Sequence, residues 1–176
     1  KISSIAPRGF MFRDFQTRNL MVMNDEPYLI DLQGGRKGPV LYDIASLVFE
    51  AKASLNEETR MLLFSHYLEL VKRRGISLGV SVMADFYLVS LIRVLQALGT
   101  YGLRGNVEKK AVFIQSIPSG LLNLERILQK LDQFSVDPYL ISLLKELCQT
   151  VDNYPKQADP FSGLTIRVFS FSYRKP

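Results

Sequence analysis

Residues 10–39 read FMFRDFQTRNLMVMNDEPYLIDLQGGRKGP, and this stretch decides the fold near the start of the chain. The short apolar runs in and beside it, GFMF, LMVM and YLID, are compatible with β-strands, so residues 8–31 are predicted to be β. The cluster NDEP between the last two runs is typical of a turn, which predicts a hairpin from Leu20 to Asp31. Glycines and prolines then predict a loop over residues 32–42.

The same stretch holds polar groups where the predicted strands begin and end. Asp14 follows the first apolar run, Asn19 leads into the hairpin and Asp31 ends it. Because the two ends of a hairpin lie together, we expect Asn19 and Asp31 to converge, with Asp14 on the loop beside them. One amide and one carboxylate suit Mg²⁺, and a separate Asp suits a catalytic base, which is the arrangement of phosphoryl transfer. The alternative is that all three are turn and cap residues, the role expected for Asp25.

From Tyr42 onward the apolar residues recur with a helical period. Asn56 and Gly75 are expected to begin and end one helix, and Asp137 is expected to cap another that has Pro138 in its first turn. A small β element, a polar loop and a helical bundle together predict an α+β fold. The predicted helices cover residues 42–53, 56–74, 80–99, 106–117, 118–132 and 137–150.

Composition narrows the class of protein. Apolar residues make up 47% of the 176 residues, which favours one domain with a core. The formal charge of +5 comes from scattered Lys and Arg residues, so we expect no nucleic-acid partner. Cys148 and His66 are each the single residue of their type, which excludes a zinc site built from Cys and His.

The most apolar window, residues 80–99, is long enough to suggest a membrane span. Asp85, Arg93 and Gln96 interrupt it, and a charge at bilayer depth is costly. The sequence therefore favours a buried helix, with no membrane partner. Since no signal peptide is recognised either, we expect a cytoplasmic protein.

The motifs FRDFQTRNLMV and YLIDLQGG resemble the catalytic and metal-binding loops of the protein-kinase-like superfamily, and more closely its aminoglycoside phosphotransferase family. Further on, GPVLYDIASLVFEA and, more loosely, RVLQALGTYG are similar to bacterial anomeric kinases of N-acetylmuramate or N-acetylglucosamine. The resemblance covers roughly residues 8–135. It implies the C-terminal lobe of a kinase-like fold that transfers the γ-phosphoryl group of ATP to a small molecule, such as an amino sugar.

The resemblance also implies roles for single residues. Asp14 would be the catalytic base, while Asn19 and Asp31 would hold Mg²⁺ on the phosphates of ATP. Asp43, in YDIASL, would be a buried support that binds the backbone of the catalytic loop. Gln16, Arg18 and Gln33 line the same loops, and the guess for these three is contact with substrate or phosphate.

Two departures from the family pattern leave an alternative open. The family usually carries His two residues before the catalytic Asp, where this chain has Phe12. A Gly-rich phosphate loop and a strand Lys should come earlier, yet only thirteen residues precede Asp14. We therefore expect the 176-residue chain to lack the lobe that covers ATP and to be inactive by itself. The alternative is a non-catalytic kinase-like binding module.

The predicted domain organisation has three parts. Residues 1–150 form the catalytic lobe, and residues 151–163, with two prolines and a glycine, read as a linker. Residues 164–176, LTIRVFSFSYRKP, alternate apolar and polar like a strand. This tail slightly resembles the opening strand of the C-terminal domain of bacterial RNase adapter proteins, so it is either an added strand or the start of a second domain.

Overall fold

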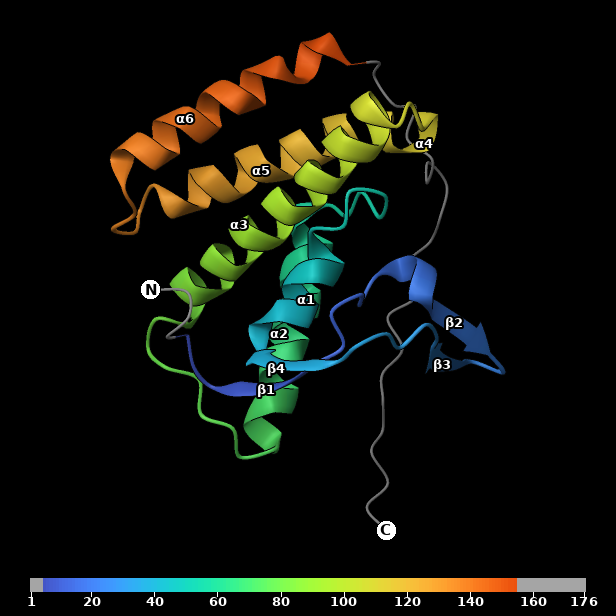
Figure 1. Cartoon of the computed structure of the whole chain (residues 1–176). Coiled ribbons are helices and arrows are strands. Elements are labelled where there is room, and N and C mark those ends of the chain that lie inside the picture. The colour runs from blue at the N-terminus through green and yellow to red at the C-terminus, as the bar shows by residue number, and fades with distance from the viewer. Residues whose placement is uncertain (1–4, 155–176) are drawn as a thin grey trace.

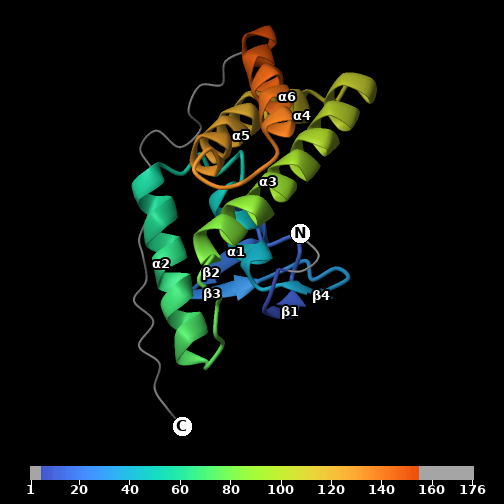
Figure 2. The ribbon, with the colours of Figure 1, turned by 90° about the vertical axis from the view of Figure 1, so that its left-hand side faces the viewer.

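The structure, a computed structural model, describes residues 5–154 and has the α+β fold that the sequence predicts. The strands lie at one end of a helical body, and α5 and α6 lie at the other (Figures 1 and 2). The strands are β1 (Arg8–Met11), β2 (Leu20–Met23), β3 (Glu26–Leu29) and β4 (Arg36–Pro39). The α-helices are α1 (Leu41–Val48), α2 (Glu57–Arg73), α3 (Val82–Tyr101), α4 (Ala111–Ile114), α5 (Ile117–Leu131) and α6 (Pro138–Gln149). Shorter helical turns are η2 (Thr17–Asn19), η3 (Gly102–Val107) and η4 (Thr150–Asn153).

The predicted hairpin is confirmed as β2 and β3, paired antiparallel from Leu20 opposite Leu29 to Met23 opposite Glu26. The two residues between the strands, Asn24 and Asp25, have φ angles of 51° and 61°. Positive φ at both positions is the type I′ turn that matches the twist of a hairpin, and Asn and Asp tolerate it well. Asp25 is therefore a turn residue, as predicted.

Strand β4 corrects the prediction of a loop over residues 32–42. Arg36–Pro39 pair antiparallel with Arg8–Met11, so the second small sheet joins segments that lie far apart in the sequence. The glycine content concealed this strand. A Cβ atom on Gly38 would lie 2.2 Å from the sulfur of Met11, so the missing side chain makes room for the partner strand. Pro39 is the last residue of β4, where a missing N–H is tolerated.

Helix ends follow the predicted signals at α2 and α6. The Asn56 side chain accepts a hydrogen bond from the Thr59 N–H at 2.8 Å, and Gly75, just after α2, has a φ angle of 70°. Asp137 likewise accepts from the first backbone N–H groups of α6, whose first residue is Pro138. These caps are confirmed, and each satisfies backbone groups that a helix end leaves unpaired.

The prediction of one helix over residues 106–117 is wrong. The end of α3 passes into the π-helical turn η3, and α4 follows as a separate short helix. Lys109, between them, has a φ angle of 58°, which no right-handed helix accommodates. Pro118 does not separate two helices but lies in the first turn of α5, where its missing N–H leaves no gap.

Helix α3 forms the centre of the core and packs against α1 on one side and α5 on the other. Phe86 of α3 stacks on Phe64 of α2 with ring centroids 3.9 Å apart, and Leu124 of α5 is completely buried beside them. Among the described residues, one segment, Val82–Val107, has the length and composition of a membrane span. Such a segment is weak support for a membrane, because the core helix of a soluble protein has the same properties.

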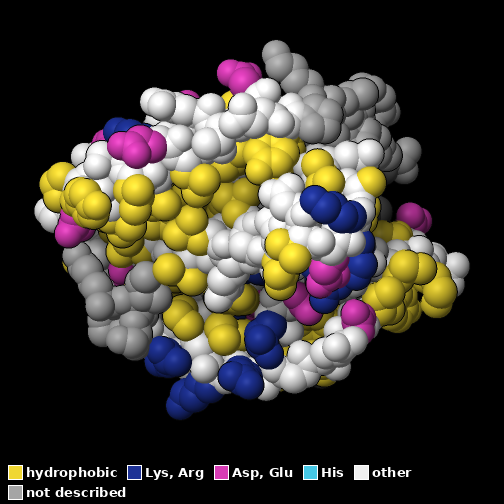
Figure 3. All heavy atoms as spheres, turned by 45° about the horizontal axis from the view of Figure 1, so that its top comes forward, with side chains coloured by type: hydrophobic (Ala, Val, Ile, Leu, Met, Phe, Trp, Pro, Cys, Tyr) yellow, Lys and Arg dark blue, Asp and Glu magenta, His cyan; other side chains and the backbone are white. Residues whose placement is uncertain are grey.

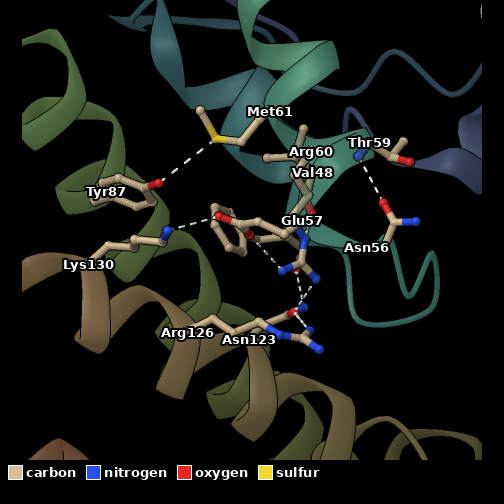
Figure 4. A network of polar contacts seen from close by, with 11 residues as sticks. Val48, Asn56, Glu57, Thr59, Arg60, Met61, Tyr87, Asn123, Arg126 and Lys130 are labelled. Carbon is tan, nitrogen blue, oxygen red and sulfur yellow. Dashed lines mark hydrogen bonds and ion pairs between the residues drawn. The ribbon is translucent and has the colours of Figure 1, made fainter.

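A buried polar network fixes the end of α1 to α2 and α5 (Figure 4). The Arg60 guanidinium donates to the Val48 carbonyl at 3.0 Å and to Asn123 Oδ1 at 2.8 Å, and Asn123 Nδ2 donates to the Phe49 carbonyl at 3.0 Å. Burial lowers the pKa of Arg60 to about 10, so it remains protonated at neutral pH. Carbonyls at the C-terminus of α1 therefore have partners, and the chain leaves α1 in a fixed direction toward Glu50.

Away from the strands, hydrophobic side chains gather on the face that comes forward in Figure 3, over α5 and α6. The exposed large hydrophobic residues of these two helices are Leu122, Tyr139, Leu140, Leu143 and Leu147. The structure describes residues 151–154 of the predicted linker, in and just after η4, whereas residues 155–163 and the predicted strand over 164–176 lie outside the described residues.

Candidate active site

The 12–19 loop, Phe12 to Asn19, connects β1 to the hairpin and is tied to the first turn of α1. The backbone N–H of Phe12 donates to Asp43 Oδ2 at 2.7 Å, and that of Arg13 donates to Asp43 Oδ1 at 2.9 Å. Arg13 has a φ angle of 76°, which costs a non-glycine residue on the order of 1 kcal/mol. Asp43 holds both N–H groups in this strained conformation, so the residue that follows, Asp14, leaves the strand in a defined direction.

Asp43 is half-buried, and burial raises the pKa of its carboxyl group above the ordinary value of 3.8. The hydrogen bonds from Phe12 and Arg13 and the positive charge of Arg93 act in the opposite direction. Each oxygen of the Asp43 carboxyl group accepts one backbone hydrogen bond from the 12–19 loop. This is the contact that the sequence led us to expect of Asp43; its role in catalysis stays a prediction.

The far end of the 12–19 loop is tied to the other end of α1 by a residue that the sequence analysis missed. Glu50 Oε2 accepts a hydrogen bond from the Thr17 N–H at 2.7 Å, although the Glu50 side chain is buried. Buried carboxylates are rare unless they are paired, so an acidic residue inside the apolar run LVFEA was the available signal. Two carboxylates at opposite ends of one helix thus clamp one loop.

Within the loop, Asn19 and Phe12 are both buried. Asn19 Nδ2 donates to the backbone carbonyl of Asp14 at 2.8 Å, which fixes the backbone that carries the predicted base. Phe12 occupies the position where the family usually has His, and it packs edge-on against Phe15 with ring centroids 6.3 Å apart. Phe12 therefore shapes the loop by packing.

Asp14 lines a pocket of about 470 Å³ at the junction of the loops and the helices. The loops contribute Arg13, Asp14, Gln33 and Gly34, and the helices contribute Tyr42, Arg93 and Gln96. Of the predicted site residues, the structure thus brings Asp14 and Gln33 together here. The volume of this pocket lies in the range of sites that bind small molecules.

The predicted metal ligands lie at the open end of the hairpin. The Ile30 N–H donates to the Asn19 carbonyl at 3.0 Å, one residue before Asp31, so the hairpin register brings Asn19 and Asp31 to the same end. Asp31 has a φ angle of 61°, and its Oδ1 accepts a hydrogen bond from Gln33 Nε2. Gln33 therefore links this end of the hairpin to the pocket that holds Asp14.

This pair of oxygen ligands fits Mg²⁺. Asn19 Nδ2 donates to the backbone carbonyl of Asp14, while Asn19 Oδ1 accepts no hydrogen bond from the described residues. Over residues 5–154 no group of three or more His, Cys, Asp or Glu side chains could hold a metal ion. A cation at Asn19 and Asp31 would thus need phosphate and water for its remaining ligands, which is how Mg²⁺ is usually bound.

The other two residues guessed to contact substrate or phosphate do not line this pocket. Gln16 precedes η2, and its carbonyl accepts the Asn19 N–H at 2.9 Å. Arg18 is exposed within η2. The helical wall of the pocket is instead formed by residues that the sequence analysis gave no committed role.

Comparison with known proteins supports the same segment. The model of the phosphotransferase enzyme family (APH) matches residues 4–74, which include the 12–19 loop, the hairpin, α1 and α2. The resemblance to this phosphotransferase family is confirmed. The matched residues contain every site residue that was predicted from the sequence.

Two curated relatives extend the phosphotransferase similarity beyond this segment. The N-acetylmuramate/N-acetylglucosamine kinase of Neisseria meningitidis serogroup B is 28% identical over 145 residues, which are 80% of this chain and 42% of the relative. The protein of the same name from Pseudomonas aeruginosa is 29% identical over 123 residues, 68% of this chain and 36% of the relative. The chain thus spans about two fifths of the length of these relatives. No solved structure matches it significantly.

Proposed function

We propose that this chain is the acceptor-binding and metal-binding C-terminal lobe of an ATP-dependent kinase that phosphorylates a hydroxyl group of an amino sugar. The observation that carries the proposal is the position of Asp14. It faces a pocket of about 470 Å³ from a loop that Asp43 clamps to the helical body, within the segment that matches the phosphotransferase family. A carboxylate held beside a substrate-sized pocket is what transfer to a hydroxyl group requires.

Asp14 would act as the general base. Its carboxylate accepts the proton of the acceptor hydroxyl while the acceptor oxygen bonds to the γ-phosphorus and the bond from that phosphorus to ADP breaks. Asn19 and Asp31 would hold Mg²⁺, which when bound neutralises charge on the nucleotide phosphates. Asp43 and Glu50 do not react in this scheme; they keep the 12–19 loop in position.

The acceptor is proposed from the two relatives, whose names give N-acetylmuramate and N-acetylglucosamine as substrates. The pocket suits such a molecule because its walls are polar, with hydrogen-bonding groups on Gln33, Tyr42 and Gln96. A few polar side chains placed in a pocket can orient a ligand by hydrogen bonds, and a sugar offers many hydroxyl groups for such bonds.

A second lobe that covers the nucleotide is part of the proposal. The hairpin exposes apolar side chains, including Met21, Val22 and Leu29, each with about half of its surface accessible. A patch of this kind at the edge of a site is typical of a surface that another part of a protein or a ligand covers. We therefore expect the 176-residue chain alone to bind ATP weakly and to be inactive. We propose the cytoplasm as the location of the protein, because ATP is available there.

The sugar-kinase proposal is tested with the complete gene product, ATP and Mg²⁺ against N-acetylmuramate, N-acetylglucosamine and glycerol. We expect sugar-dependent formation of ADP, and a sugar phosphate visible by phosphorus NMR. The alternative, a non-catalytic binding module, is motivated by Phe12 at the usual His position. Calorimetric binding of an amino sugar without any ADP formation would favour that module and contradict the kinase.

A further inference from the structure

The pocket wall formed by α1 and α3 contains an arginine that the proposed chemistry does not use. Arg93 and Gln96 lie on α3 almost one turn apart, and Tyr42 lies on α1. All three line the pocket that also contains Asp14. The wall therefore places a cation in the same pocket as the predicted base.

Arg93 is held in place by neutral partners. Its Nε donates to the hydroxyl of buried Ser46 at 2.9 Å, and its guanidinium lies 5.8 Å from the centroid of the Tyr42 ring. The Tyr42 hydroxyl donates in turn to Gln96 Oε1 at 3.0 Å, so the three side chains form one connected wall. A guanidinium fixed in this way loses little conformational entropy when it binds a ligand.

The charge of Arg93 has no carboxylate partner among residues 5–154. The ion pairs there involve other residues, and the terminal nitrogens of Arg93 make no hydrogen bond within the described part of the chain. Asp43 is near enough for the charge of Arg93 to lower its pKa, but its two oxygens accept the Phe12 and Arg13 N–H groups. A half-buried guanidinium thus keeps donors available in a polar pocket.

We propose that Arg93 binds a carboxylate group of the acceptor and so makes the enzyme prefer an anionic amino sugar over a neutral one. The proposal rests on the proposed function, because it assumes that the acceptor hydroxyl lies at Asp14. N-acetylmuramate carries a lactyl carboxylate that N-acetylglucosamine lacks, and a planar carboxylate matches the two parallel donors of a guanidinium. With its Oε1 accepting from Tyr42, the Gln96 side chain has its amide Nε2 left to donate to the same ligand.

The test compares three acceptors with the complete gene product: N-acetylmuramate, its neutral methyl ester and N-acetylglucosamine. We expect wild-type kcat/KM to be about 10- to 100-fold higher for the acid than for the ester, the range of a charge-assisted hydrogen bond. In Arg93→Gln this ratio should fall to near one. Arg93→Lys keeps the positive charge but loses the two parallel donors of the guanidinium, so it should give an intermediate ratio.

Arg104→Gln is the matched control, because Arg104 also lies against an aromatic ring, that of Phe113 at 5.5 Å, but does not line the pocket. It should leave the acid-to-ester ratio at the wild-type value. An unchanged ratio in Arg93→Gln, or an equal fall with all three acceptors, would overturn the proposal and leave Arg93 as a structural or phosphate-binding residue.

The outcome is separable from that of the proposed function. If the wild-type protein phosphorylates none of the three acceptors, the kinase proposal fails, and calorimetry then decides the role of Arg93. Tighter binding of the acid than of the ester, lost in Arg93→Gln, would still support a carboxylate site. Equal binding of the two would overturn it.

Discussion

The 12–19 loop and the β2–β3 hairpin follow each other in the sequence, but the rest of the chain supports them very differently. Asp43 and Glu50 bind the loop backbone from the two ends of α1, and Asn19, the last residue of the loop, is buried. The hairpin is paired only with itself, and the residues from Met21 to Lys37 are all exposed. The structure thus fixes the predicted base in advance and leaves one of the predicted metal ligands, Asp31, on an open edge.

This difference agrees with the two roles proposed for the loop and for Asp31. A base must be aimed at one oxygen atom, and a misplacement of about 1 Å can cost 100-fold in rate, so its loop has to be rigid. A metal ligand can be ordered when the ion and its phosphates arrive, because they supply most of the coordination shell. The predictions below test this division.

The largest expected effect is at Asp14. Asp14→Asn keeps the shape of the side chain but removes the base, so kcat for sugar phosphorylation should fall by about 10²- to 10⁴-fold. Asp25→Asn is the matched control, because Asp25 is exposed in the turn at a φ angle that Asn also tolerates. Steady-state assays on folded protein check both. Wild-type turnover by Asp14→Asn would mean that the base lies elsewhere.

The free energy of unfolding of two leucine variants compares the hairpin with the helical core. Leu124 is completely buried, whereas Leu29 of the hairpin is 50% exposed. We expect Leu124→Ala to lower the free energy of unfolding by about 2–5 kcal/mol. The identical change Leu29→Ala should cost less than about 1 kcal/mol. Urea denaturation of the two variants is the measurement, and equal losses would show that the hairpin is part of the cooperative core.

Glu50 is expected to act as a positioning residue. Glu50→Ala removes the acceptor of the Thr17 N–H, so kcat should fall by about 10-fold, the value of one hydrogen bond to a charged group. Glu50→Gln keeps an oxygen in the same place and should restore most of the rate. Glu146→Ala, on the exposed surface of α6, serves as the control. If Glu50→Gln is as slow as Glu50→Ala, the hydrogen bond is not what positions the loop.

The smallest effect concerns the pH dependence of stability. Because burial raises the pKa of Asp43 above 3.8, the folded chain binds its proton more tightly than the unfolded chain does. The contribution of Asp43 to the free energy of unfolding therefore falls as pH rises from 3.8 through the raised pKa. Relative to Asp43→Asn, the wild-type protein should lose stability toward urea as the pH rises through this window. A relative gain in stability with rising pH would contradict the raised pKa.

Local patterns predicted some parts of the fold and site well. Turn chemistry at NDEP gave the hairpin and the place of Asp25, and cap residues gave the ends of α2 and α6. Features that depend on pairing across the chain were not predictable from one segment. Strand β4 exists only because β1 pairs with it, so its glycines and prolines resembled a loop.

The candidate site shows the same limit. Asp14, Asn19 and Asp31 were chosen for their spacing, and the hairpin register explains why the last two come to one end. The pocket wall on α3 comes from a distant helix, so Arg93 could be recognised only as a charge within an apolar run. Glu50 could likewise be recognised only as a charge within an apolar run. Its partner is the backbone N–H of Thr17, and a backbone group cannot be recognised from the residue type.

The most direct test of the division between loop and hairpin is a Mg²⁺ titration of sugar phosphorylation by the wild-type protein, Asp14→Asn and Asp31→Asn. We predict that Asp31→Asn raises the Mg²⁺ concentration for half-maximal rate by about 10-fold or more, since it removes one of two protein ligands. Asp14→Asn should lower the maximal rate and leave the Mg²⁺ requirement at the wild-type value. An equal shift of the Mg²⁺ requirement in both variants, or a shift only in Asp14→Asn, would contradict the assignment of the base to Asp14 and of a metal ligand to Asp31.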